Sequence, residues 1–203
     1  MRIGVELNGV LRDTLKKVQE VYQKWYIDNP FLDESEDNFK REIISDVTSL
    51  DIMSHLKFKD EDELYNFLYK EYTMEIFGHA GSVEISGMID FNEFYLDMRE
   101  NHEILIVSDE ISKSKPASLF YISKFGCLVE MVKFYSETTI NSMWNSVDIL
   151  LTANPKLLLN YPKNKIVIKF ETMYNKDIEV EHTITSIKEL KSKIEKIYVN
   201  NTK

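Results

Sequence analysis

The spacing of apolar residues changes along the chain between that typical of a strand and that typical of a helix. These changes predict that strands and helices alternate. Residues 2–7 are rich in β-formers and end at a turn signal, Asn8-Gly9, after which residues 11–26 have helical spacing. Four later apolar runs have the length of buried strands: 104–107, 128–134, 147–151 and 166–170. The pattern predicts an α/β fold in which helices cover both faces of an open parallel sheet.

Helix signals lie between and after these runs. Residues 89–98 carry apolar side chains at helical spacing, and a helix should hold Pro116 in its first turn and stop at Gly126. Near the end of the chain, residues 186–189 fit a capping box, and the apolar stripe that follows predicts a final helix packed on the sheet.

The segment 28–75 differs in composition from the rest of the chain. It holds 14 acidic and 5 basic residues, an excess that equals the net charge of -9 of all 203 residues. Apolar residues at helical spacing between Leu64 and Tyr72 predict that this acidic segment is helical.

Charge and composition exclude several classes of function. A pI near 5.0 with no cluster of Lys and Arg argues against binding to nucleic acid or to anionic membranes. One cysteine and four scattered histidines offer neither a disulfide nor a metal-ligand spacing, so we expect no metal. Without a secretion signal or a long apolar run, we expect a protein that is not secreted, located in the cytoplasm or in a virion assembled there.

Polar residues follow the predicted strands, where the carboxyl ends of parallel strands form ligand sites. Residues 3–14 read Ile-Gly-Val-Glu-Leu-Asn-Gly-Val-Leu-Arg-Asp-Thr, Ser108 ends the next strand, Lys115-Pro116 opens a helix, and 148–155 read Asp-Ile-Leu-Leu-Thr-Ala-Asn-Pro. In this order they resemble the four motifs of the haloacid-dehalogenase (HAD) superfamily, whose opening motif usually reads Asp-x-Asp-Gly-Val-Leu. Within that superfamily the arrangement is most similar to small phosphatases of the nucleotidase type.

The resemblance implies a domain organisation and a set of roles. It implies a three-layer Rossmannoid core at 1–20 and 85–203, with an inserted helical cap at 21–84. The nucleophile position falls on Glu6, the acid/base position on Asn8, and the phosphate-binding positions on Ser108 and Lys115, with Lys113 as an alternative. The magnesium positions fall on residues 152–154.

The chain departs from the HAD pattern at three of these positions: the nucleophile, the acid/base group and the magnesium site. Glu6 carries an extra methylene that displaces the attacking oxygen by about an ångström, which can cost roughly 100-fold in rate. The amide of Asn8 does not titrate in the working pH range and cannot transfer a proton to a leaving group. Between Ile149 and Leu159 there is no Asp or Glu to bind Mg²⁺, so the fourth motif, Asn154 included, is degenerate. We therefore predict degenerate catalytic positions, no enzyme activity and no cofactor.

A fold without its reactive groups predicts a structural or protein-binding subunit of a larger assembly, viral assemblies included. Its partner would be a protein or a second copy of the chain, bound through the acidic residues Asp60, Glu61, Asp62 and Glu63. Two alternatives stay open. One is a divergent magnesium-dependent phosphatase or 5'-nucleotidase, and the other is a sensor that binds an anion or nucleotide at Ser108 and Lys115 without turnover.

Overall fold

Parallel strands form one six-stranded sheet in the computed structural model, which describes residues 1–29 and 39–201. The strands are β1 (Arg2–Glu6), β2 (Glu103–Asp109), β3 (Met131–Tyr135), β4 (Ile149–Thr152), β5 (Ile166–Phe170) and β6 (His182–Ile184). Their order across the sheet is β3-β2-β1-β4-β5-β6, so β1 lies between β2 and β4. Ile3 of β1 is opposite Ile104 on one side and Ile149 on the other.

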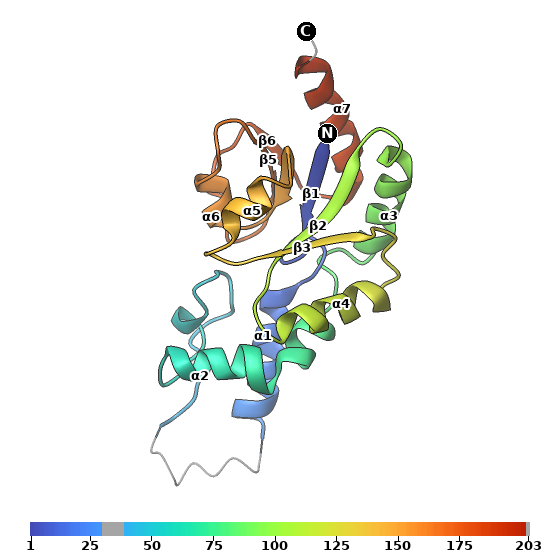
Figure 1. Cartoon of the computed structure of the whole chain (residues 1–203). Coiled ribbons are helices and arrows are strands. Elements are labelled where there is room, and N and C mark those ends of the chain that lie inside the picture. The colour runs from blue at the N-terminus through green and yellow to red at the C-terminus, as the bar shows by residue number, and fades with distance from the viewer. Residues whose placement is uncertain (30–38, 202–203) are drawn as a thin grey trace.

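Helices of the described residues connect and cover these strands (Figure 1). The α-helices are α1 (Thr14–Tyr22), α2 (Glu61–Asn66), α3 (Gly87–Met98), α4 (Ser114–Lys124), α5 (Ile140–Trp144), α6 (Pro155–Leu159) and α7 (Leu190–Asn201). Shorter π-helical or 3-10 turns are η1 (Gln23–Ile27), η2 (Ile52–Ser54), η3 (Phe67–Glu71), η4 (Met74–Gly78) and η5 (Ile187–Glu189). None of the helices in this part of the chain is long and apolar enough to cross a membrane.

Alternation along each strand divides the core into two layers, one on each face of the sheet. Ile104 and Ile106 of β2 belong to the cluster that holds side chains of α3, α4 and α7. Leu105 and Val107 belong to the cluster on the opposite face, with side chains of α5 and α6. The side chains of a strand point alternately to the two faces, and here both faces are buried. The predicted three-layer α/β architecture is therefore confirmed.

Element boundaries differ from the predicted ones where a tertiary contact decides them. The first helix was predicted from residue 11 but begins at Thr14, because Arg12 instead forms an antiparallel bridge with Ser82. The strand predicted at 128–134 spans Met131–Tyr135, and β6, with three residues, was not predicted. The capping box at Ser186 is present and begins a 3-10 turn that leads into α7.

The helical part of the chain that includes α1 and α2 lies below the sheet in Figure 1 and has its own cluster of buried side chains. It joins α1, residues 56–58, η3 and η4, and reaches Ala117 of α4. Tyr22 is at its centre, with its ring about 5.1 Å from that of Phe58. The predicted acidic segment falls mostly in this part, but its residues 30–38 lie outside the described residues. The boundaries of the cap at residues 21 and 84 stay a prediction.

The turn after β1 depends on a glycine, which gives a direct test of the fold at this edge of the sheet. Gly9 has φ 74°, and a Cβ there would lie 2.1 Å from Oη of Tyr174. Gly9→Ala should therefore lower the free energy of unfolding by roughly 2 to 4 kcal/mol, measured by chemical unfolding.

Two further variants separate the two causes of this loss, the contact with Tyr174 and the positive φ of the backbone. Gly126 also has a positive φ, 66°, but nothing lies within 4 Å of its Cβ position, so Gly126→Ala should cost only about 1 kcal/mol. Tyr174→Phe removes the clashing oxygen and should restore part of the stability of Gly9→Ala. Equal losses for the two alanine variants would contradict the turn geometry.

Candidate functional site

Polar side chains from four strands meet at the carboxyl edge of the sheet. Glu6 ends β1, Ser108 and Asp109 end β2, Tyr135 ends β3, and Thr152 ends β4. Because β1 pairs with both β2 and β4, these ends come together as expected for a parallel sheet. The structure thus brings together three of the predicted positions, Glu6, Asn8 and Ser108, and places Asn154 in the wall of the same cavity.

Glu6 is almost completely buried, with 1% of its surface exposed. One carboxylate oxygen accepts a hydrogen bond of 2.8 Å from the hydroxyl of Tyr135, and the other accepts one from the hydroxyl of Thr152. Burial raises the pKa of Glu6 from 4.5 to about 7, although both hydroxyl groups act in the opposite direction. Near neutral pH a large fraction of this side chain is therefore protonated, which weakens it as a nucleophile.

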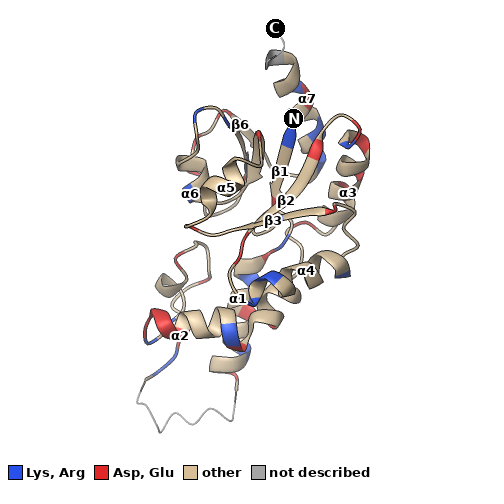
Figure 2. Cartoon of the chain, viewed as in Figure 1, with Lys and Arg blue, Asp and Glu red and all other residues tan. Residues whose placement is uncertain are grey.

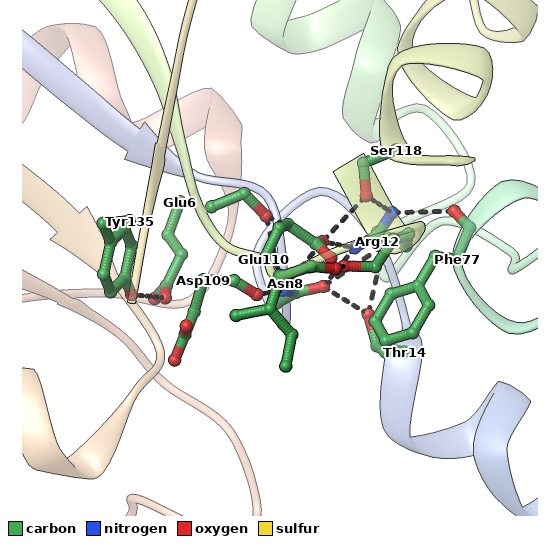
Figure 3. A network of polar contacts seen from close by, with 12 residues as sticks. Glu6, Asn8, Arg12, Thr14, Phe77, Asp109, Glu110, Ser118 and Tyr135 are labelled. Carbon is green, nitrogen blue, oxygen red and sulfur yellow. Dashed lines mark hydrogen bonds and ion pairs between the residues drawn. The ribbon is translucent and has the colours of Figure 1, made fainter. Parts of the chain in front are cut away.

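The amide of Asn8 is held on both sides by neighbouring side chains (Figure 3). Its oxygen accepts hydrogen bonds from Nη2 of Arg12 at 2.5 Å and from the hydroxyl of Thr14 at 2.7 Å. Its nitrogen donates to Oγ of Ser108 at 3.3 Å. Asn8 therefore acts as a fixed connector between the turn after β1 and the end of β2.

A buried ion pair joins Arg12, in the turn after β1, to Glu110, directly after β2. Nη2 of Arg12 lies 2.5 Å from Oε1 of Glu110, and both side chains have 0% exposure. The same guanidinium donates to the backbone oxygen of Phe77 and to Oγ of Ser118, each at 2.7 Å. One side chain thus links the turn after β1 to β2, to η4 and to α4.

Hydroxyl groups complete the surroundings of the Glu110 carboxylate. Oε1 accepts hydrogen bonds from Ser108 at 3.1 Å and from Ser118 at 2.8 Å, in addition to the contact with Arg12. Within the described residues, Oε2 has no hydrogen-bond partner. The charge of Glu110 is therefore balanced mainly through one oxygen and by one guanidinium.

The predicted lysines lie apart from this network. Lys113 and Lys115 are both exposed, at the start of α4, and neither lines the cavity beside Glu6. The α4 side chain that reaches the polar network is Ser118 instead. Of the two residues predicted to bind an anion, Ser108 is fully buried and already donates to a carboxylate.

The acidic residues predicted to bind a partner lie at the start of α2, away from the sheet (Figure 2). Asp60 caps the helix by accepting a hydrogen bond from the backbone N–H of Glu63, at 2.8 Å. Glu63 in turn forms an ion pair with Arg41. Glu61 and Asp62 are exposed. Two of the four predicted residues thus stabilise the local structure, and two project into solvent.

A cavity of about 480 Å³, here called the strand-end cavity, separates the strand ends from the helical part of the chain. Charged side chains from the strand ends and from the helical part line it: Glu6, Asp13, Asp51, Asp109 and Lys156. Tyr69, Phe77 and Tyr174 add aromatic walls. The lysine forms an ion pair of 3.2 Å with Glu137. The cavity therefore carries an excess of negative charge.

The residues at the magnesium positions do not fit that ion. Both oxygens of Glu6 accept hydroxyl hydrogen bonds, and Thr152 and Ala153 provide no carboxylate. The amide oxygen of Asn154 accepts a hydrogen bond of 2.9 Å from the backbone N–H of Lys156, which caps α6. Mg²⁺ requires hard, mostly anionic oxygens to offset its dehydration, and these positions offer few.

Three residues of this network were not predicted from the sequence as part of the site: Arg12, Glu110 and Ser118. A sequence signal existed, since Arg12 and Glu110 are opposite charges that each follow an apolar strand closely. They are 98 residues apart, and the pairing of β1 with β2 is what makes them neighbours.

Comparison of the whole chain with solved structures identifies the fold. A HAD-superfamily hydrolase of subfamily IA, variant 1, from Geobacter sulfurreducens PCA superposes with a TM-score of 0.53 and 10% identity, over 93% of this chain and 96% of that one. The fold is HAD-like. A haloacid dehalogenase-like family hydrolase from Xanthomonas campestris gives a TM-score of 0.51 and 6% identity, over 98% and 96%. No protein-family model and no curated protein matches the sequence significantly.

In this HAD-like fold, the Arg12–Glu110 pair should be the most sensitive polar contact. Arg12→Met leaves a buried carboxylate without its counter-charge and should lower the free energy of unfolding by roughly 3 to 5 kcal/mol. The double variant Arg12→Met/Glu110→Met removes both charges and should recover most of that loss, as measured by chemical unfolding.

An exposed ion pair provides the matched control. Lys156 and Glu137 keep 75% and 87% of their side chains exposed, so Lys156→Met should change the unfolding free energy by less than about 1 kcal/mol. A double variant that is as unstable as Arg12→Met would show that the ion pair is not what stabilises this network.

Proposed function

We propose that this HAD-like protein is catalytically inactive and serves as a protein-binding subunit of a larger assembly. The observation that carries the proposal is the Glu110 carboxylate, which takes the hydroxyl hydrogen bonds of Ser108 and Ser118 and the charge of Arg12. In the HAD resemblance, Ser108 would hold a phosphoryl oxygen of the substrate. Here the chain provides its own anion to that hydroxyl group.

Electrostatics adds to this argument. A phosphoryl group at Ser108 would lie beside the buried carboxylate of Glu110, which it would have to displace from its ion pair. On the way it would pass the carboxylates of the strand-end cavity, where Lys156, the one lysine that lines it among the described residues, is already paired with Glu137. Like charges that come close together in a partly buried cavity repel strongly. This site therefore disfavours anionic substrates.

The acid/base position also lacks a group that can protonate the leaving group. In the resemblance, the position of Asn8 protonates the leaving group, and its amide is instead held by Arg12 and Thr14. An amide does not titrate in the working pH range and cannot replace a carboxylic acid there. A fold that keeps its sheet and its helical part while it lacks these groups is useful for its shape and contacts, which supports a role in binding.

Turnover is the first test. With millimolar Mg²⁺, the protein should hydrolyse neither an aryl phosphate nor nucleoside monophosphates above the rate in buffer, measured as released phosphate. The double variant Glu6→Asp/Asn8→Asp should stay inactive as well, because Glu110 still occupies Ser108 and the cavity still repels the substrate. Activity of the natural chain that Glu6→Ala abolishes would refute the proposal and favour a phosphatase.

Association through the start of α2 is the second test. Glu61→Lys/Asp62→Lys reverses the two exposed acids and spares Asp60 and Glu63, which stabilise the helix. We expect it to weaken association with any protein that co-purifies from the native extract, or self-association, by about tenfold in sedimentation, with a smaller effect at high salt.

The matched control changes the same charge elsewhere. Glu93→Lys/Glu100→Lys alters two exposed acids in and just after α3. It should leave association within about twofold of the natural chain. If both pairs of reversals act equally, the effect is one of net charge, and the start of α2 is not a specific contact surface.

A further inference from the structure

A second hollow adjoins the strand-end cavity and extends it along the surface. This outer hollow, of about 690 Å³, lies between α1, residues 46–48 and residues 171–174. Gly9, Asp13, Leu15 and Tyr174 line both hollows, so the two form one continuous cleft. Each alone is within the range of about 300 to 1,000 Å³ that is typical of ligand pockets. A ligand that occupies both hollows therefore has to be extended rather than compact.

The cleft has a strong excess of negative charge along its whole length. Seven acidic side chains of the described residues line it: Glu6, Asp13, Glu20, Asp46, Asp51, Asp109 and Glu171. Glu20 and Glu171 form ion pairs with Lys17 and Lys169, and a large fraction of Glu6 is protonated near neutral pH, so the excess of negative charge comes mainly from the four aspartates. Against them stand two lysines, Lys16 in the outer hollow and Lys156 in the strand-end cavity. A cleft lined by one sign of charge focuses the field and concentrates ligands of the opposite sign.

Two of these carboxylates are available to a ligand in the strand-end cavity. Among the described residues, none donates a hydrogen bond to the carboxylate of Asp51 or to that of Asp109, and both residues are exposed. Figure 3 shows the Asp109 side chain extending away from the Arg12 network. Asp51 comes from the helical part and Asp109 from β2, so they approach the cavity from opposite sides.

Apolar side chains at the rim and in the walls complete the chemistry of the cleft. Met173 is 74% exposed beside the outer hollow, and Leu50 is 43% exposed beside the strand-end cavity. The aromatic walls include Tyr69, Phe77 and Tyr174. Aromatic rings stabilise cations above their faces, and exposed apolar groups next to charge are typical of protein interfaces.

We propose that this cleft binds a basic segment of a protein partner, with a Lys or Arg side chain in the strand-end cavity and apolar neighbours against Leu50 and Met173. This inference rests on the proposed binding function and names its partner's chemistry. Charge complementarity selects the occupant, because an anionic ligand is repelled and a neutral one leaves the carboxylates of Asp51 and Asp109 without a counter-charge. The two adjoining hollows and their apolar rim favour a peptide over a small free amine.

The test measures binding of a short fluorescein-labelled peptide of alternating Lys and Leu, by fluorescence anisotropy with the full chain. The natural protein should bind it, and should not bind the same peptide with Glu in place of Lys. Asp51→Lys/Asp109→Lys should weaken binding by about tenfold or more, and Asp51→Asn/Asp109→Asn by an intermediate factor. Circular dichroism verifies that each variant is folded.

The control variant Glu93→Lys/Glu100→Lys carries the same charge change outside the cleft and should bind within about twofold of the natural chain. Equal losses in the cleft variant and this control would overturn the inference. So would displacement of the peptide by butylamine at an equal concentration of cation, which would make a free amine the ligand.

The outcomes separate this inference from the proposed function. If the natural chain ignores the basic peptide but still associates with its co-purified partner and releases no phosphate, the cleft assignment is wrong and the binding role stands. Phosphate release that depends on Glu6 would instead overturn the binding role itself, together with the inference that rests on it.

Discussion

A guanidinium buried in a protein interior needs an anion beside it, and much of this structure follows from how the chain provides one. Arg12 is fully buried, and Glu110 is its counter-charge. The pair brings the turn after β1 against the end of β2, while the remaining donors of Arg12 reach Phe77 and Ser118. The network therefore fixes the turn that leads into the helical part and the strand ends that form the cavity. Burying either charge alone would destabilise the folded chain, because the charge loses its hydration. The contact between the two charges offsets much of that free-energy cost.

The fold class could be predicted from the sequence because the alternation of strands and helices depends on local patterns. Ile104 and Ile106 alternate with Leu105 and Val107, and such alternation within a short apolar run is typical of a strand buried on both faces. β6 could not be predicted in this way, because its three residues carry too little of the pattern. The order of the strands depends on long-range pairing, about which periodicity says nothing.

The candidate site was predicted in part, for a related reason. Ser108 could be found because the end of a parallel strand has a known place in the fold. The spacing of motifs favoured Lys115, but α4 begins at Ser114 and its buried face presents Ser118 to the network, which only packing decides. Arg12 and Glu110 stayed unrecognised as a pair, since nothing in a linear pattern links charges so far apart.

The ion pair also constrains the order in which such a protein can change during evolution. A chain that lost Arg12 first would leave a carboxylate buried without its counter-charge, and one that lost Glu110 first would leave a buried guanidinium alone. Either intermediate is less stable than the chain before and after it, and natural proteins have little stability to spare. The two positions therefore depend on each other: a chain that is to keep its stability has to change both residues together or neither.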